Sequence, residues 1–446
     1  MMDSTTPGGR LYEVLSHGPG EIVAIGPCGA ITAARFRRDV AALAAILPEA
    51  GFLVNLCTDR YRFMVGFAAA LLRGQVSLMP ATATPAILQD LAEEYPGLYA
   101  LTDGEVPVLF HLPFPASLPE AEEATLTIPG AQPAVVLFTS GSTGKPKPVT
   151  KSWSVLVHSA RTAGTRLGVE ALRGGCIVGT VPHQHSYGLE SLITLAWQHG
   201  LAVFTGIPLF PADVRAALQA APAPRLLVTT PVHLRALTAD PGEMPALAML
   251  LCATAPLPPA LAEAAEATFC APLVEIYGCT EAGQIATRRP TQESGWHCFD
   301  AVRLHRDASG WWAQGAAVEG VAPVQDEIEP IGDAHFRLGS RSADLVNIAG
   351  KRSSISYLNH QLLAIPGVKD GTFLMEESKA QAVPRLKALV VAPGLTASQI
   401  LQALRERLDA AFLPRPLVLV ESLPRNHLGK LLRADMLALA AGRAPE

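Results

Sequence analysis

The feature of the sequence that most constrains its fold is a series of short apolar runs separated by segments of helical length. The apolar runs occupy 51–57, 75–80, 98–103, 134–140, 176–182, 201–206, 225–231, 247–253 and 273–278. Between several of them lie the helix-length segments 61–74, 85–95, 211–221 and 258–269. Near-continuous apolar strands that alternate with helices are typical of parallel sheets covered on both faces. The pattern predicts an α/β fold, in which ligands bind beyond the carboxyl ends of the strands.

The amino-acid composition of the chain changes after about Asp326, where charged residues, Gly and Ser become frequent. A strand is expected at 386–391, a helix at 398–412 and a further strand at 416–422. This order is typical of a small α+β unit. We therefore predict a large domain over 1–340 and a small one over 341–446.

Composition excludes several classes of protein. The 446 residues contain 35 Lys and Arg against 40 Asp and Glu, a formal net charge of −5, which favours neither nucleic acid nor a membrane surface as a partner. The apolar stretches are too short for a membrane span, and the first residues do not resemble a signal peptide. Seven cysteines without a CxxC pair indicate free thiols in a reducing cytoplasm. We expect Cys57, Cys176 and Cys252 to be buried.

The loop FTSGSTGKPKPV at 138–149 follows the apolar run PAVVL. Glycine-rich backbone and lysine together can hold phosphate oxygens. The spacing excludes a P-loop, because only two residues separate Gly141 from Gly144 and Lys145 is followed by Pro146. Taken alone, the loop is equally consistent with a polar surface turn.

Four further motifs follow the loop along the sequence. They are PHQHSYG at 182–188, EIYGCTEAG at 275–283, SRSADLVNIAGKRSS at 340–354 and LPRNHLGKLLR at 423–433. With the loop, they resemble the adenylate-forming superfamily of acyl- and aryl-CoA synthetases, peptide-synthetase adenylation domains and luciferases. The resemblance covers nearly the whole chain, although the N-terminal region is short for this superfamily and its first third matches only diffusely.

The resemblance implies an adenylation domain of parallel-rich sheets layered with helices, followed by a small mobile α+β domain. It also implies an ATP- and Mg²⁺-dependent reaction in which a carboxylate attacks the α-phosphate and forms an acyl-adenylate. A thiol, either of CoA or of a carrier-protein phosphopantetheine, then takes the acyl group. Two anions 4 Å apart repel by about 4 kcal/mol at an effective dielectric constant near 20, so the site must supply cations and N–H donors. The short N-terminal half favours a small or aromatic carboxylic acid over a long-chain one.

The resemblance also assigns roles to individual residues. Around the β- and γ-phosphates it places Thr139, Ser140, Gly141, Ser142, Thr143, Gly144 and Lys147. Glu281 would hold Mg²⁺, Thr280 would contact the α-phosphate, and Tyr277 with Gly278 would lie near the adenine. Pro148 stands where the superfamily has glycine, and it removes a donor N–H.

The ribose, the acid and the second domain complete the assignment. Asp326 lies fifteen residues before Arg341 and would accept from the ribose hydroxyls, with Asp333 as its rival. Thr254 and Ala255 would lie beside the acyl group and adenine, and His185 would line the acid pocket or gate the thiol. The remaining cationic assignments are Arg341 to ribose or phosphate, Arg352 to phosphate, and Lys430, whose ammonium would bridge the carboxylate and the α-phosphate. The pair His183 and His185 lacks a third ligand for a metal.

Other functions remain open at this point. A nucleotide-binding protein without ligase activity is consistent with Pro148, with Ala343 at the hinge and with the short N-terminal region. An enzyme that stops at the adenylate, or passes it to a nucleophile other than a thiol, shares the same motifs. The tryptophans Trp197, Trp311 and Trp312 are expected to be packing residues.

Overall fold

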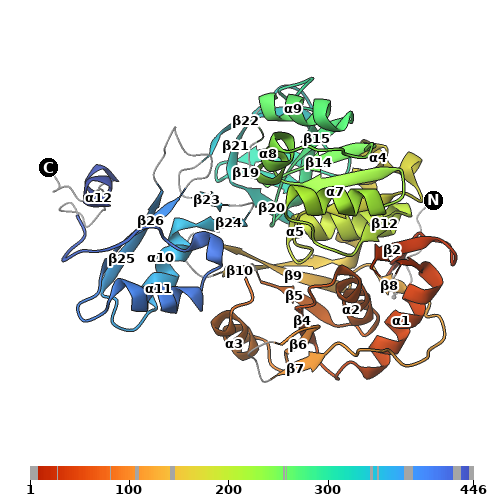
Figure 1. Cartoon of the computed structure of the whole chain (residues 1–446), viewed down its shortest axis with the longest axis horizontal. Helices are drawn as coiled ribbons and strands as arrows, with labels where there is room; N and C mark the ends of the chain where they lie inside the picture. Colours follow the sequence, from red (N-terminus) through yellow and green to blue (C-terminus); the bar gives the residue numbers. More distant parts are fainter. Residues whose placement is uncertain are drawn as a thin grey trace. The chain divides into compact units, whose positions relative to one another are not determined.

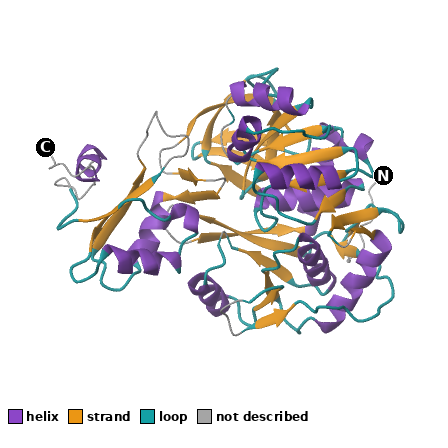
Figure 2. Cartoon of the chain, in the orientation of Figure 1, coloured by secondary structure: helices purple, strands orange, loops and turns teal. Residues whose placement is uncertain are grey.

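The computed structural model describes residues 9–27, 29–80, 82–105, 110–140, 146–254, 257, 259–341, 345–348, 351–375, 385–424 and 433–440. Its contacts divide the chain into two compact units (Figure 1). The first unit comprises 1–81, 94–137 and 148–341, and the second comprises 82–93, 138–147 and 342–446. Figure 2 shows that both units combine helices with strands.

An eleven-stranded sheet forms the centre of the first unit. In spatial order it contains β21 (Asp326–Pro330), β22 (His335–Arg341), β17 (Trp296–Cys298), β16 (Gly283–Arg288), β15 (Leu273–Cys279), β14 (Met249–Cys252), β13 (Arg225–Thr229), β11 (Cys176–Gly179), β12 (Ala202–Phe204), β2 (Ile22–Gly26) and β3 (Gly29–Thr32). The strands from β15 to β2 are parallel, whereas those at both edges are antiparallel.

Helices cover both faces of this sheet. One face packs against α7 (Pro211–Ala220), α8 (Pro231–Ala239) and α9 (Pro259–Phe269), which lie together in Figure 1. The other face packs against α4 (Trp153–Leu167), α5 (Ser186–Gly188), the π-helix η2 (Leu189–Thr194) and α6 (Leu195–His199). Side chains of a strand alternate between faces, and Cys176 and Val178 accordingly join the first layer while Ile177 joins the second. The apolar runs are continuous because both faces are buried.

A second sheet of six strands lies beside α1 (Ala33–Ile46) and α2 (Arg60–Leu72). Its order is β10 (Pro146–Ser152), β9 (Pro133–Ser140), β5 (Val76–Met79), β4 (Phe52–Asn55), β6 (Tyr99–Thr102) and β7 (His111–Pro113). Smaller sheets pair β1 (Leu11–Glu13) with β8 (Thr127–Pro129), and β19 (Gly310–Gln314) with β18 (Arg303–Asp307) and β20 (Val321–Val324). Trp197 is fully buried and its ring stacks on Phe67 at 5.9 Å, which confirms its packing role.

Arg60 fastens α2 to the large sheet. Its buried guanidinium donates from Nη2 to the carbonyl oxygens of Gly179 and Val181, at 2.7 and 2.8 Å, and from Nη1 to Phe204 O at 3.2 Å. These carbonyls end or follow β11 and β12. Burial lowers the pKa of Arg60 to about 9, so the group remains charged at neutral pH.

The second unit contains the strands expected near the C-terminus, whereas the helix expected over 398–412 is divided into an α-helix that ends at Arg405 and a short 3-10 helix from Ala410 to Phe412. Its elements are α3 (Pro85–Glu94), β23 (Leu345–Ile348), β24 (Lys351–Ser354), α10 (Ile355–Leu363), β25 (Asp370–Met375), β26 (Leu386–Val391), α11 (Ala397–Arg405), η3 (Ala410–Phe412), β27 (Leu417–Leu419) and α12 (Arg433–Ala440). Its core includes Leu358, Phe373 and Ile400.

The predicted fold class is confirmed. Each of the nine apolar runs named above contains a strand, and each of the four helix-length segments named between them contains a helix. The predicted burial of Cys57, Cys176 and Cys252 is also confirmed, since all three are 0% exposed. The boundary between 340 and 341 stays a prediction. Among the described residues, no helix has the length and hydropathy required to cross a membrane.

Candidate functional site

Several predicted site residues follow neighbouring strands of the large sheet. The strands β11, β13, β14 and β15 are adjacent and parallel, so their carboxyl ends lie at one edge. His185 lies in the segment after β11, Thr254 follows β14, and Thr280 and Glu281 follow β15. The structure therefore brings these four residues to the edge where α/β sheets bind ligands.

The turn that carries Thr280 and Glu281 has a tightly determined backbone. It joins β15 to the antiparallel strand β16, and both residues are half-buried. A Cβ added to Gly278 would lie 2.2 Å from the carbonyl oxygen of Gly283, and Gly283 itself has a φ of +79°. Only glycine tolerates such an approach and such a torsion without strain. The glycines of YGCTEAG thus fix the path of the turn.

Tyr277 and Asp326 form a buried hydrogen bond beside this turn. The tyrosine hydroxyl donates to Asp326 Oδ2 at 2.8 Å, and the two residues are 5% and 6% exposed. The ring of Tyr277 also packs against Trp296 and Phe336, with centroids 5.5 and 5.8 Å away. Asp326 begins β21, whereas its rival Asp333 is exposed in the connection after that strand. This placement favours Asp326 as the acid that belongs to the YGCTE motif.

The PHQHSYG segment is anchored at several points. His185 caps α5 by accepting from the backbone N–H of Tyr187 at 3.3 Å, and the Tyr187 hydroxyl donates to Thr229 O at the end of β13. A Cβ on Gly188 would lie 2.0 Å from Pro182 O. The close approach of these backbones explains the glycine, and it holds half-buried His185 at the sheet edge.

His183 has a structural role in the same segment. It is 0% exposed, and its Nε2 lies 3.0 Å from Cys57 O, to which it donates. Burial, reinforced by the charge of Arg60, lowers the pKa of His183 to about 3. The imidazole is therefore neutral at physiological pH and ties the segment to the loop after β4.

The other predicted residues are placed only by their backbone or lie outside the described residues. Lys147 is exposed on β10, Thr139 and Ser140 end β9, Arg341 ends β22, and Arg352 lies in β24. Outside the described residues are Gly141, Ser142, Thr143, Gly144, Ala255, Ala343 and Lys430. Their predicted roles stay predictions.

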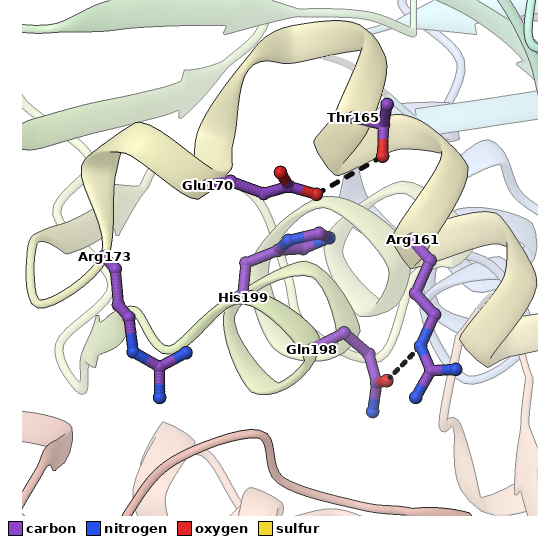
Figure 3. A pocket seen from close by; sticks show the side chains of 6 residues that line it. All are labelled: Arg161, Thr165, Glu170, Arg173, Gln198 and His199. Atoms are coloured by element: carbon purple, nitrogen blue, oxygen red, sulfur yellow. Dashed lines mark hydrogen bonds between the residues drawn. The ribbon is translucent and has the colours of Figure 1, made fainter.

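A cavity of about 450 Å³ lies away from this edge (Figure 3). Its lining residues are Arg161, Thr165, Glu170, Arg173, Gln198 and His199. Arg173 precedes β11 and His199 precedes β12, so the cavity is at the amino ends of the strands. Arg161 Nε donates to Gln198 Oε1 at 3.0 Å, and Arg173 pairs with Glu21 at 2.5 Å. The polar groups largely satisfy one another, and the predicted chemistry lies elsewhere.

The sequence did not predict a buried polar group behind the turn. Lys151, Glu190 and Gln284 are 1%, 2% and 6% exposed. The signal that could have revealed the first two is their position, because Lys151 lies two residues after the loop 138–149 and Glu190 lies two residues after PHQHSYG.

Comparison with solved structures identifies the fold class of the chain. The structure is similar to o-succinylbenzoate CoA synthetase from Bacillus subtilis, with a TM-score of 0.80 and 20% identity over 96% of this chain and 97% of that one. It is also similar to a malonyl-CoA ligase, with a TM-score of 0.75 and 18% identity over 91% and 97% of the two chains. The fold is therefore that of the adenylate-forming enzymes.

Comparison of the amino-acid sequence with known proteins identifies the family of the chain. A family model described as AMP-binding enzyme matches residues 90–302. The chain is 30% identical over 302 residues to a 4-coumarate--CoA ligase of Rhodobacter capsulatus, covering 66% of this chain and 74% of the relative. It is 24% identical over 459 residues to a 2-succinylbenzoate--CoA ligase of Bacillus velezensis, covering 89% and 86%. The chain belongs to the AMP-binding enzyme family, and the predicted class of AMP-forming acid:thiol ligase is confirmed.

Substitution of the two rival aspartates tests the ribose assignment. We expect Asp326→Asn to weaken binding of a fluorescent ATP analogue roughly tenfold or more, because a charged acceptor is replaced by a neutral one. Tyr277 can still donate to the asparagine oxygen, so the fold should persist. Asp333→Asn serves as the matched control and should change the Kd less than twofold. Weakening by the Asp333 substitution alone would reverse the assignment.

The low pKa of His183 predicts a pH dependence of stability. Below pH 6.5 the unfolded chain binds a proton at this histidine that the folded chain does not bind, so its contribution to the free energy of unfolding falls as pH falls toward 3. Between pH 6.5 and 5 this loss is about 2 kcal/mol. Urea denaturation of His183→Gln, which keeps a donor for Cys57 O, should show a decline smaller by that amount. Parallel declines in the two proteins would contradict the assignment.

Proposed function

We propose that this chain activates a small or aromatic carboxylic acid with ATP and passes the acyl group to the thiol of CoA or of a carrier-protein phosphopantetheine. The carboxylate oxygen attacks the α-phosphorus, and the bond from that phosphorus to the pyrophosphate oxygen breaks. The thiolate then attacks the acyl carbon, and AMP leaves with the electron pair of the broken C–O bond. Each step is a balanced group transfer that requires no oxidant or reductant.

The observation that carries this proposal is the arrangement at the carboxyl edge of the large sheet. Thr280 and Glu281 lie in a glycine-fixed turn, the bonded pair Tyr277 and Asp326 lies beside it, and His185 follows a neighbouring strand. A binding protein has no need of an acid and a hydroxyl beside an imidazole at one edge, whereas a ligase can use the first two in the phosphoryl step and the imidazole at the acid pocket or the thiol gate. The two relatives described above, from Rhodobacter capsulatus and Bacillus velezensis, are named as CoA ligases.

The roles of the polar residues follow from their chemistry. Glu281 is half-buried at the edge, and its carboxylate is the kind of hard oxygen ligand that Mg²⁺ prefers. Bound there, Mg²⁺ would neutralise phosphate charge. Thr280 would donate to an α-phosphate oxygen, and Lys147 would balance the outer phosphates. Lys430, from the predicted mobile domain, would bring the cation that lets the carboxylate approach.

The identity of the acid is proposed only as a class. Relatives named for 4-coumarate, indoleacetate and 2-succinylbenzoate all act on acids with an aromatic ring. Together with the short N-terminal half, this supports an aryl acid as the substrate. A carrier protein as acceptor and a cytoplasmic location belong to the same proposal.

ATP–pyrophosphate exchange across a panel of acids tests the proposal. The panel contains 4-coumarate, indoleacetate, 2-succinylbenzoate, benzoate and octanoate, with ATP alone as the blank. We expect at least one aryl acid to support exchange at a kcat/KM at least tenfold above that of octanoate. Transfer is then measured with CoA and, separately, with a phosphopantetheinylated carrier protein.

The outcomes separate the competing functions. Binding of ATP without exchange for any acid would support a nucleotide-binding protein and contradict the ligase. Exchange without thioester formation on either thiol would indicate an enzyme that stops at the adenylate or uses another nucleophile. Faster exchange with octanoate than with every aryl acid would overturn the substrate class alone.

A further inference from the structure

Two charged side chains are buried directly behind the turn of Thr280 and Glu281. Lys151 lies on β10 and is 1% exposed, while Glu190 lies on the π-helix η2 and is 2% exposed. A Cβ built on Gly283 would lie 3.0 Å from Nζ of Lys151 and 3.1 Å from Oε2 of Glu190. Both charges thus point at the same α-carbon. We call Lys151, Glu190 and Gly283 the buried charge cluster.

The carboxylate of Glu190 joins three elements. Its Oε2 accepts from Ser159 Oγ on α4 at 2.8 Å and from the backbone N–H of Gln284 on β16 at 3.4 Å. Its Oε1 accepts from Ser186 Oγ on α5 at 2.9 Å. Gln284 is three residues after Glu281 in the sequence, and Ser186 is the residue after His185. One carboxylate therefore connects the turn and the His185 segment to the helix beneath them.

A buried carboxylate is costly unless it is hydrogen-bonded and balanced in charge. Three donors contact its oxygens, and the ammonium of Lys151, which lies close to the same Cβ position of Gly283, places an opposite charge nearby. Replacement of buried charge pairs by well-packed hydrophobic residues is often neutral or stabilising in proteins, so packing alone does not require these two charges. The energetic cost of burying these two charges is explained if the position of the turn is more important to the protein than the stability that apolar residues would add.

We propose that Glu190 is a positioning residue for the turn of Thr280 and Glu281, with Lys151 as its counter-charge. This inference rests on the proposed function, because the turn is the element that function uses. Supporting contacts of this kind typically contribute 10- to 100-fold to activity or metal affinity. The residue acts through backbone position and does not touch the reacting atoms.

Four variants separate positioning from charge balance. Glu190→Met removes the acceptors and the charge, and we expect it to lower kcat for ATP–pyrophosphate exchange by 10- to 100-fold and to lower Tm. Lys151→Met alone should lower Tm, because it leaves an unbalanced buried carboxylate. The double variant Lys151→Met with Glu190→Gln keeps an acceptor without net charge, so kcat should stay within threefold of the native value.

The decisive variant combines Lys151→Met with Glu190→Met. Its charges are balanced, so Tm should rise above that of either single variant, although the three buried donors left by Glu190 keep it below the native value, while kcat remains at least tenfold low. Recovery of kcat together with Tm would overturn the positioning role, as would a native kcat in Glu190→Met. Glu266→Met is the control, because Glu266 also accepts three hydrogen bonds, from Leu273 N, Arg289 and Thr291, but joins α9 to the start of β15 and to the segment after β16. It should lower Tm and leave kcat within twofold.

The assay uses whichever acid of the panel gives the fastest exchange with the native chain. Absence of exchange with every acid would refute the proposed function, and the inference is then decided by binding of the fluorescent ATP analogue. In that case the ratio of its affinities with and without Mg²⁺ should be at least fivefold smaller in the Lys151→Met, Glu190→Met variant than in the native chain. An unchanged ratio would refute the positioning of Glu281 by Glu190.

Discussion

The alignment of parallel strands in the large sheet is the constraint on which the rest of the molecule depends. Because β11, β13, β14 and β15 are adjacent parallel strands, the segments that follow them lie at the same edge of the sheet. Arg60 strengthens this edge, since its guanidinium holds carbonyls at the ends of β11 and β12 to the start of α2. Loops from distant parts of the sequence thereby become neighbours without any contact between their own side chains being required.

The carboxyl edge of the large sheet combines half-buried side chains with a buried layer behind them. Thr280, Glu281 and His185 are half-buried, where a ligand can reach them. Behind them, the hydrogen bond of Tyr277 to Asp326 and the three bonds accepted by Glu190 hold the backbone from within. A site that must bring a carboxylate and a phosphate together benefits from donors and cations that are fixed before the reaction. The buried layer can supply that rigidity.

The sequence predicted the strands, the helices and the family, because each of these is written in local patterns or in short motifs. It also proposed Asp326 from its spacing to Arg341, and the structure adds a partner, Tyr277, that spacing could not identify. The contact of His183 with Cys57 joins residues 126 positions apart, and no local pattern encodes it. Lys151 and Glu190 lie next to two of the motifs, but their burial was missed for the same reason, since it depends on partners from distant parts of the sequence. The antiparallel pairing of β16, β17 and β22 was not predicted either, because it joins residues from separate segments that no motif connects.

The central claim is that an oxygen of the acid becomes bonded to the α-phosphorus of ATP. An acid labelled with ¹⁸O in its carboxylate tests this directly when one full turnover is carried out and the AMP is analysed by mass spectrometry. The account predicts AMP that carries one ¹⁸O atom from the acid, in unlabelled water. Unlabelled AMP, with the oxygen lost from the acid found in pyrophosphate, phosphate or water, would contradict it.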